Sequence, residues 1–383
     1  EEEEEEEDAI KLSPAEQCGA PKGAVGGWAS CVRLFDPKTN ETLQVDELDG
    51  DEAALSCCMA TFAGNLTEVM LVVGTVVGLQ FNPRAQKGGF IRVYRFVGED
   101  GRAMELLHKT PVDNVPLSMA GFQGRLLCGV GSSLRLYELG KKKLLLKSEN
   151  KNFPNAICTI QTQGERVYVG DIQEGFHFVR YKPEDNMMYI FADETCPRWL
   201  TTGMMLDYDT VAGGDKFGNV FISRLPQDVS EEMEDDPTGG RLAAAQSALN
   251  GAANKTVAIA QFHVGEAVSG MAKATLQPGG LEVLVYGTIC GTIGAMLPFT
   301  SREDVDFASQ LEMHMRQELP PLCGRDHLAY RSYYHPVKDV MDGDLCEQFT
   351  SLSADAQRSV AESMERTPGE VVRKLEELRT RIC

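Results

Sequence analysis

The sequence predicts a mainly β fold, an incomplete WD40-like β-propeller of about five blades followed by a small α-helical C-terminal domain. A short apolar run that ends in glycine recurs at Arg125–Gly129, Arg166–Gly170 and Asp209–Gly213, and its glycines lie 41 and 43 residues apart. A period of about 40–45 residues built from short strands is typical of a propeller, in which each period supplies one four-stranded blade. No copy carries the His and Trp-Asp residues of the common repeat, so the pattern is propeller-like only.

A second alternating segment follows each glycine-ended run, and two weaker copies of the pair flank the three clear ones. Such alternation places one face of a strand against a neighbouring layer. The last interval is 74 residues, but it contains the polar stretch 226–255, whose removal leaves 44. We predict an exposed insertion there, between strands of one blade, with a short helix at 243–249. The remaining expected strands are 134–139, 176–181, 220–225, 71–74 with 90–96, and 284–287 with 293–299.

The recurring glycine has a simple local interpretation. Glycine adopts positive φ without steric cost, and a tight turn between two strands demands that conformation. We therefore expect each recurring glycine to stand at a strand end and to open the turn into the next strand.

Past residue 300 the apolar period changes from two to about 3.6, which predicts helices. We expect them around 307–315, around 345–352, over 354–365 behind a capping serine, and from Thr367 to the end. The last begins with Thr367-Pro-Gly-Glu370, which has capping-box spacing and proline at the first helical position. Its apolar stripe is expected to pack on the chain's own neighbours, with a partner groove as the alternative. The stripe consists of Val371, Leu375, Leu378 and Ile382.

Charge separates the N-terminus from the rest. Residues 1–8 are all acidic, and we predict a disordered tail over 1–27, with the blades at 28–300 and the helical domain at 301–383. Because a propeller closes by pairing distant strands, we expect this chain to be the C-terminal part of a longer protein.

The net charge of −20 opposes direct nucleic-acid binding and favours protein partners. The one basic run, 141–143, is interpreted as a solvated hairpin, with phosphate binding as the alternative.

Cofactor and catalytic signals are weak. The 11 cysteines include no Cys-x-x-Cys, and the spacing of Cys323, His327 and His335 matches no zinc pattern. Asp342 and Asp344 precede an apolar stripe, so helix capping explains them better than a cation site does. No phosphate-binding loop, nucleophile elbow or His-Glu-x-x-His is present, and no apolar run is long enough for a membrane span. We expect no enzyme, no cofactor and no membrane contact.

Candidate interface residues fall in two places. Arg198 and Trp199 stand beside an expected strand start, where an exposed Trp would anchor a partner and a buried Trp would pack between blades. Polar and aromatic groups also crowd the junction between propeller and helices, where they either contact a partner or hydrogen-bond internally to join the two domains. These are Arg325, Asp326, His327, Arg331, Tyr333 and Tyr334.

The junction also carries a family resemblance. The stretches 320–327, 331–337 and 341–349 read PPLCGRDH, RSYYHPV and MDGDLCEQF, and they closely resemble the C-terminal region of the large propeller subunit of splicing factor 3b. Further stretches resemble that subunit in matching order, so the resemblance covers about 28–383. They include 107–112, 140–144, 197–199, 206–212, 215–219, 236–239 and 366–368.

This resemblance implies a non-enzymatic scaffold. Members of that family carry three seven-bladed propellers and a helical C-terminal domain, and this chain would supply most of the third propeller and all of that domain. The implied location is the nucleus, in the U2 small nuclear ribonucleoprotein that recognises the intron branch point. The implied partners are the helical-repeat subunit of splicing factor 3b and a small partner protein, with RNA contact indirect or minor.

Two related families share the architecture. The large subunits of the damaged-DNA-binding complex and of the cleavage and polyadenylation specificity factor both resemble this chain at 342–345. An adaptor of a cullin ubiquitin ligase is therefore the alternative function. The flanking residues 323–327 and 346–349 favour the splicing subunit.

Overall fold

The computed structural model describes residues 26–98, 101–235 and 251–381. The chain divides into two compact units, one formed by 1–131 with 137–146 and the other by 132–136 with 147–383. Each unit is described by itself. The predicted disordered tail, 1–27, lies outside the described residues except for its last two glycines.

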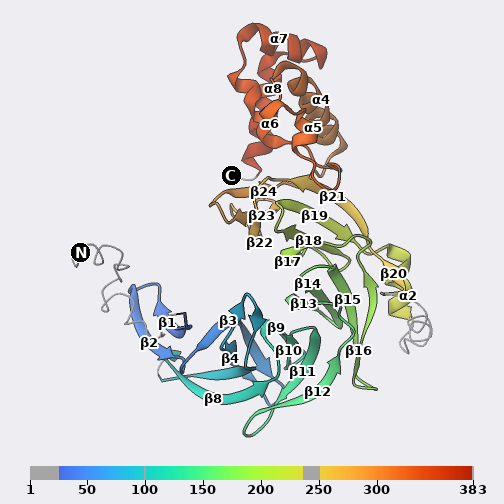
Figure 1. Ribbon diagram of the computed structural model, residues 1–383. Coiled ribbons are helices and arrows are strands. Elements are labelled where there is room, and N and C mark those ends of the chain that lie inside the picture. The colour runs from blue at the N-terminus through green and yellow to red at the C-terminus, as the bar shows by residue number, and fades with distance from the viewer. Residues whose placement is uncertain (1–25, 99–100, 236–250, 382–383) are drawn as a thin grey trace, which may run out of the picture. The chain divides into compact units, whose positions relative to one another are not determined.

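The first unit is built on a four-stranded antiparallel sheet in the order β3-β4-β7-β8. Figure 1 labels three of these strands, β3, β4 and β8. A two-stranded sheet of β1 and β2 precedes it, and a β5–β6 hairpin interrupts it between β4 and β7. Apolar side chains of this sheet form one buried cluster with those of β9 and β10. The strands are β1 Cys31–Asp36, β2 Glu41–Glu47, β3 Glu52–Phe62, β4 Asn65–Val77, β5 Gln80–Phe81, β6 Arg84–Ala85, β7 Gly89–Val97 and β8 Ala103–Val112.

The next sheet has the order β12-β11-β10-β9, and the boundary between the units falls within its last two strands along the chain. Its strands are β9 Pro116–Phe122, β10 Arg125–Val130, β11 Ser133–Leu139 and β12 Leu144–Asn150. The strand β12 forms one edge of this sheet.

The second unit continues with three more sheets, which are antiparallel except where β20 pairs in parallel with β16. Their orders are β13-β14-β15-β16-β20, β17-β18-β19-β21 and β22-β23-β24. Their strands are β13 Ile157–Gln163, β14 Arg166–Asp171, β15 Gly175–Lys182, β16 Met187–Asp193, β17 Leu200–Met205, β18 Thr210–Asp215, β19 Asn219–Arg224, β20 Asn254–Lys255, β21 Val257–His263, β22 Val268–Thr275, β23 Glu282–Thr288 and β24 Ile293–Met296.

The mainly β fold with C-terminal helices is confirmed, and so are the five repeated strand pairs. Each predicted pair corresponds to the second and third strands of one sheet: β4 with β7, β10 with β11, β14 with β15, β18 with β19, and β23 with β24. The last strand ends at Met296, short of the predicted 299.

The prediction that each recurring glycine ends a strand and opens a turn is wrong. Gly74, Gly129, Gly170, Gly213 and Gly287 lie inside strands, and none has positive φ. The turns use other glycines, at positions 131, 175, 218 and 291, whose φ values run from 58° to 93°.

Close packing accounts for two of the recurring glycines. A Cβ on Gly170 would overlap Thr159 and lie 3.0 Å from Leu200 Cδ1. A Cβ on Gly213 would overlap Phe221 and lie 2.9 Å from Leu200 Cδ2. Because Leu200 belongs to β17, the glycine on β14 lets the next sheet approach its backbone closely.

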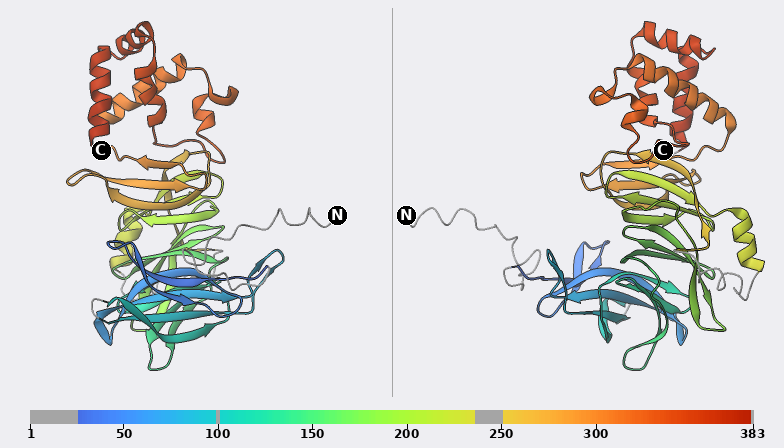
Figure 2. Two further views of the ribbon diagram at one scale, coloured as in Figure 1. Left: turned by 90° about the vertical axis from the view of Figure 1, so that its left-hand side faces the viewer. Right: turned by 45° about the vertical axis from the view of Figure 1, so that its right-hand side comes forward.

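The insertion is more ordered than expected in its described part. The chain leaves its sheet after β19 and returns to the same sheet as β21. The insertion between these strands begins with helix α2, Gln227–Asp235. This helix buries Ser230 and Met233, and it lies on the outer side of the strands of this unit (Figure 2). Further on, β20 pairs in parallel with β16, so the insertion fastens two neighbouring sheets. The short helix predicted at 243–249 lies outside the described residues.

The helices beyond residue 300 follow the sequence signals closely. Ser301, Ser353 and Thr367 cap their helices through their side chains, and Thr367 with Glu370 forms the predicted capping box. The segment around 345–352 is a short α-helix that continues as a 3₁₀ helix. The elements are α4 Arg302–Glu318, η2 Leu322–Gly324, α5 His327–Tyr330, α6 Gly343–Glu347, η3 Gln348–Ser351, α7 Ala354–Ser363 and α8 Pro368–Thr380.

These helices share one apolar core. The side chains of Val371 and Leu375 are buried together with those of Phe307, Leu311 and Phe349, and Leu378 packs against them partly exposed. The described part of the α8 stripe therefore packs on the chain's own helices, as expected. The stripe's last member, Ile382, lies outside the described residues.

Candidate protein-interaction site

Five rings from four places in the sequence meet on the surface of the second unit, and we call them the aromatic cluster. Tyr333 and Tyr334 have ring centroids 4.4 Å apart, and Phe217 lies 6.0 and 5.1 Å from them. His263 stacks on Tyr333 at 5.2 Å, and Trp199 meets Phe217 edge-on at 6.4 Å. Two of the positions marked in the sequence, Trp199 and the tyrosine pair, thus belong to one site.

The cluster is accessible. Trp199, Tyr333 and Tyr334 are 40%, 52% and 61% exposed. The ammonium of Lys216 lies 3.5 Å from the centroid of the Trp199 ring, a cation–π arrangement that leaves the lysine in solvent. Trp199 is therefore presented at the surface and not enclosed between sheets. Trp and Tyr are enriched among the side chains that contribute most to binding at protein interfaces.

Arg198 does not share this exposure. Its side chain is buried, with the guanidinium 4.4 Å from the Phe221 ring centroid and its Nε 3.8 Å from Glu194 Oε2. The Leu200 amide donates to the Arg198 carbonyl at 3.0 Å, and this tight turn presents Trp199 at the surface while Arg198 is buried. The expectation that Arg198 contacts a partner beside Trp199 is thus wrong, and its position is that of a support beneath the loop.

Glu194 is the buried partner of this arginine. Burial raises the pKa of its carboxyl to about 7, although the charge of Arg198 and the Ser223 hydroxyl act in the opposite direction. The carboxyl is therefore partly protonated near neutral pH.

Arg331 holds the helical domain to the β21 sheet. Its Nε donates to Asp342 Oδ2 at 2.6 Å and its Nη2 to Asp342 Oδ1 at 3.2 Å, while the guanidinium lies 4.8 Å from the Phe262 ring centroid. Asp342 also accepts from the Leu345 amide as the N-cap of α6, as predicted. For Arg331, internal bonding is the observed role.

The connection that carries the tyrosines runs along the outer edge of β21. The His263 amide donates to the Arg331 carbonyl at 3.0 Å, and Gln261 and Lys338 exchange two backbone bonds of 3.0 Å. Between these anchors, Tyr333 and Tyr334 are held beside the end of β21. The chain thus fixes the backbone on both sides of the exposed rings.

A hydrogen-bond relay positions the ring of His263. Asp215 accepts from Asn219 Nδ2 at 2.7 Å, which fixes the amide so that its Oδ1 faces His263 Nδ1 at 3.0 Å. The imidazole therefore donates from Nδ1. Burial, together with the charge of Arg331, lowers the pKa of His263, so the ring that stacks on Tyr333 is neutral at physiological pH.

Three further candidates lie in and before α5. Asp326 caps α5 by accepting from the Leu328 amide, and it pairs with Arg316 of α4 at 3.0 Å. His327 is buried, whereas Arg325 is exposed. Asp326 and His327 thus have structural positions within the helical domain.

Phe217 and His263 belong to the aromatic cluster but were not predicted from the sequence as site residues. The turn Asp215-Lys-Phe-Gly-Asn219 contained a signal for the first, because a phenylalanine between a strand-ending Asp and a turn glycine cannot easily reach a core. No local signal marks His263, since only the pairing of β21 with β19 brings it to Asn219.

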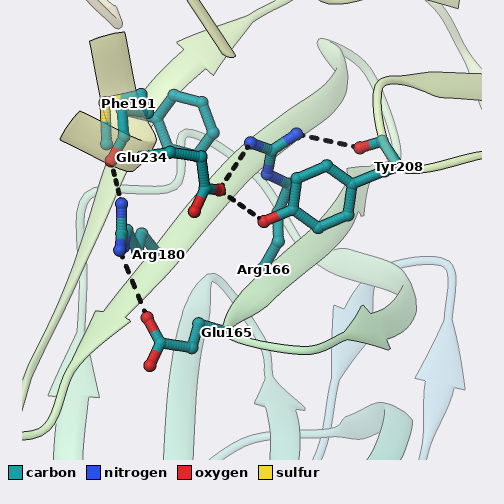
Figure 3. A pocket seen from close by; sticks show the side chains of 7 residues that line it. Glu165, Arg166, Arg180, Phe191, Tyr208 and Glu234 are labelled. Atoms are coloured by element: carbon teal, nitrogen blue, oxygen red, sulfur yellow. Dashed lines mark hydrogen bonds and ion pairs between the residues drawn. The ribbon is translucent and has the colours of Figure 1, made fainter. Parts of the chain in front are cut away.

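A second polar site is occupied by the chain's own insertion (Figure 3). Arg166 donates to the Tyr208 carbonyl at 2.9 Å and pairs with Glu234 of α2 at 3.5 Å, while the Tyr208 hydroxyl donates to Glu234 at 2.7 Å. Arg180 donates to the Met233 carbonyl near the end of α2. These contacts satisfy the charged groups of the pocket, which is where α2 docks.

The described residues contain no metal-binding cluster and no helix that could cross a membrane. Within 26–98, 101–235 and 251–381, no group of three or more His, Cys, Asp or Glu side chains has a metal-binding arrangement. The helices in those same ranges are too short or too polar to cross a membrane.

Known proteins are similar to this chain over nearly its whole length. Spliceosome-associated protein 130 A of Arabidopsis thaliana is 57% identical over 96% of this chain and 30% of its own length. Splicing factor 3B subunit 3 of Danio rerio is 52% identical over 95% of this chain and 30% of its own length. Probable splicing factor 3B subunit 3 of Dictyostelium discoideum is 51% identical over 97% of this chain and 29% of its own length.

These matches confirm the resemblance inferred from 320–349. The chain spans about 30% of the length of the curated relatives it matches. Residues 29–351, which include every described strand and the aromatic cluster, match the family described as the CPSF A subunit region. The chain therefore belongs to the family of the CPSF A subunit region.

Proposed function

We propose that this chain is part of a non-enzymatic scaffold subunit of the splicing factor 3b complex in the U2 small nuclear ribonucleoprotein. The observation that supports this most strongly is the identity of 51–57% over nearly the whole chain to proteins named as splicing factor 3B subunit 3 or spliceosome-associated protein 130. The scaffold holds the helical-repeat subunit while the branch point of pre-mRNA is recognised, and it works in the nucleus.

The charge of the chain supports protein contacts over RNA contacts. A formal charge of −20 repels the phosphate backbone, so direct RNA binding by this region is minor. Repeated sheets with exposed side chains at their turns supply broad surfaces, as a scaffold requires.

The aromatic cluster is the surface of the second unit that we propose for partner contact. Tyr333, Tyr334 and Trp199 present rigid aromatic area, and the stacked His263 and the anchored backbone reduce the entropy lost on binding. Arg325, which is exposed just before α5, is retained as a secondary candidate.

One experiment tests the assembly. The tagged full-length protein is recovered from nuclear extract, and its partners are identified by mass spectrometry and its RNA by sequencing. Recovery of U2 RNA with the helical-repeat subunit supports the proposal. Recovery of a cullin in place of these would replace it with the ubiquitin-ligase adaptor.

The role of the cluster is tested separately by variants of the same tagged protein. The double variant Tyr333→Ala/Tyr334→Ala should retain its fold and lose at least about tenfold of the helical-repeat subunit. Phe81→Ala, which removes another exposed aromatic ring from the β5–β6 hairpin, is the control. Equal recovery by both variants would exclude the cluster as a contact and leave the assembly itself unaffected.

A further inference from the structure

The turn between β18 and β19 presents a lysine on the rings of the aromatic cluster. Lys216 is exposed, and its ammonium lies 3.5 Å from the centroid of the Trp199 ring and 4.9 Å from that of the Phe217 ring. Each ring attracts the cation through its electron-rich face, so the two rings together hold the ammonium in one place. The charge is therefore positioned before a partner binds.

The backbone of this turn is also held. The Lys216 amide donates to the Trp199 carbonyl at 3.1 Å. One carboxylate oxygen of Asp215 accepts from the amides of Phe217 and Asn219, each at 2.9 Å. Lys216 thus projects from an ordered turn, and a contact made through it orders little additional backbone.

The ammonium of Lys216 has no anionic partner among the residues that the structure describes. Two carboxylates that stand near the turn use their oxygens elsewhere. Asp215 is buried and also accepts from Asn219 Nδ2 at 2.7 Å. Glu266, between β21 and β22, accepts from the Thr288 hydroxyl. The N–H donors of this ammonium are therefore available to a partner.

Lys216 is the charge that this surface presents to a partner. Asp215 is buried, the guanidinium of Arg331 is bonded to Asp342, and the ring of His263 is neutral at physiological pH. A negative side chain is therefore attracted to the rings, although the chain as a whole has a net charge of −20.

We propose that the aromatic cluster binds a segment of its protein partner in which an acidic side chain stands beside an apolar one. The carboxylate accepts hydrogen bonds from the Lys216 ammonium, and the apolar side chain packs on the exposed rings of Tyr333 and Tyr334. Hydrogen bonds between two charged groups are stronger than neutral ones, especially where the rings keep water away. A cationic segment is disfavoured, because Lys216 repels it and already lies on the face of Trp199.

This inference rests on the proposed role of the cluster in partner contact, and it does not depend on which complex contains the chain. Two other occupants would use the same rings. A cationic side chain would compete with Lys216 for them, and single-stranded RNA would stack its bases on them while Lys216 met a phosphate.

Carbodiimide cross-linking of the complex that is purified through the tagged full-length protein tests the contact directly. This reagent joins an amine to a carboxylate when the two groups are in contact. Mass spectrometry should find Lys216 joined to an Asp or Glu of another subunit, with an apolar residue beside that carboxylate in its sequence. Absence of any link from Lys216 to another protein would overturn the proposal.

Substitutions at Lys216 separate the three occupants. Lys216→Gln should lower recovery of the contacted subunit about fivefold, whereas Lys216→Arg, which keeps the cation, should stay within about twofold of the wild type. Lys142→Gln, at an exposed lysine of the first unit, is the control and should have an effect below about twofold.

Unchanged recovery with Lys216→Gln would overturn the proposal, and so would increased recovery, which would indicate a cationic occupant. Loss of the contacted subunit on ribonuclease treatment of the wild-type complex would also overturn it, because RNA would then be the occupant. If the recovered complex contains a cullin in place of splicing subunits, the proposed function fails, while the link from Lys216 still decides the present proposal.

Discussion

Arg331 and Asp342 are joined by two hydrogen bonds, of 2.6 and 3.2 Å, and both side chains are largely buried. The same carboxylate begins α6 by accepting from Leu345. One residue therefore fixes both the start of a helix and the attachment of the helical domain to the β21 sheet.

Replacing this carboxylate should destabilise the second unit strongly. Asp342→Ala leaves the Arg331 guanidinium buried without its partner and removes a helix cap, so we expect a loss of about 3–5 kcal/mol in the free energy of unfolding. Urea denaturation followed by circular dichroism measures it. Asp344→Ala is the control, because that carboxylate is 90% exposed and its 3.3 Å pair with Arg331 is worth little. Equal losses for both variants would contradict the role assigned to Asp342.

A second buried carboxylate ties the first of the C-terminal helices to the last. Asp304 in α4 is 1% exposed and lies 2.8 Å from Lys374 Nζ and 2.6 Å from Arg381 Nη1. Asp304→Asn should lower the free energy of unfolding by about 2 kcal/mol, because two cations lose their shared anion. The neighbouring exposed Glu303, changed to Gln, should have an effect of about 0.5 kcal/mol or less. Chemical denaturation of both variants measures these changes. If Asp304→Asn were as stable as the wild type, these ion pairs would contribute no net stability.

The packing explanation for the recurring glycines yields a matched pair of substitutions. Gly170→Ala places a methyl against Thr159 and Leu200 and should cost about 1–3 kcal/mol. Gly287→Ala has its nearest atom, Ser269 Oγ, at 4.0 Å and should be neutral or mildly stabilising. Thermal unfolding distinguishes them. If the two variants melt alike, close approach is not what glycine provides at position 170.

Glu194 makes stability depend on pH. Its folded-state pKa of about 7 lies above the ordinary value of 4.5, so the native state holds the proton more tightly than the unfolded chain does. The resulting stabilisation is complete below pH 4.5 and is lost as the pH rises towards 7. Between pH 5 and 8 the wild type should therefore lose on the order of 2 kcal/mol relative to Glu194→Gln, which cannot titrate. Denaturant titrations of both proteins across this range measure it, and parallel pH profiles would contradict the raised pKa.

Much of the fold could be read from local chemistry. The alternating segments behind Gly129, Gly170 and Gly213 predicted the central strands correctly, because burying one face of a strand requires that alternation. The capping box at Thr367 and the cap at Asp342 were equally local, since each capping side chain bonds the amide three residues further on. The reason for the recurring glycine was not available locally, because the atoms that exclude a Cβ at position 170 come in part from Leu200.

The candidate site was only partly predictable for the same reason. The sequence marked Trp199, Tyr333 and Tyr334 as aromatic groups beside breaks in the pattern, and it gave no reason to link them. It also paired Arg198 with Trp199, whereas Arg198 is buried and Trp199 is exposed at a tight turn. No sequence signal predicted helix α2, because its apolar content is small and its contacts with Arg166 and Arg180 come from distant strands.

The sequence by itself determined the repeated strands, the caps, the change from strands to helices after residue 300, and the family resemblance carried by 320–349. Each of these depends on residues close together along the chain. The tertiary structure alone decided that Phe217 and His263 join the exposed rings and that Arg198 and Glu194 are buried. It also decided that the side chains of Leu145 and Leu146 remain exposed. Exposure and distant contacts depend on how sheets pack, and that packing is not encoded in any single stretch of sequence.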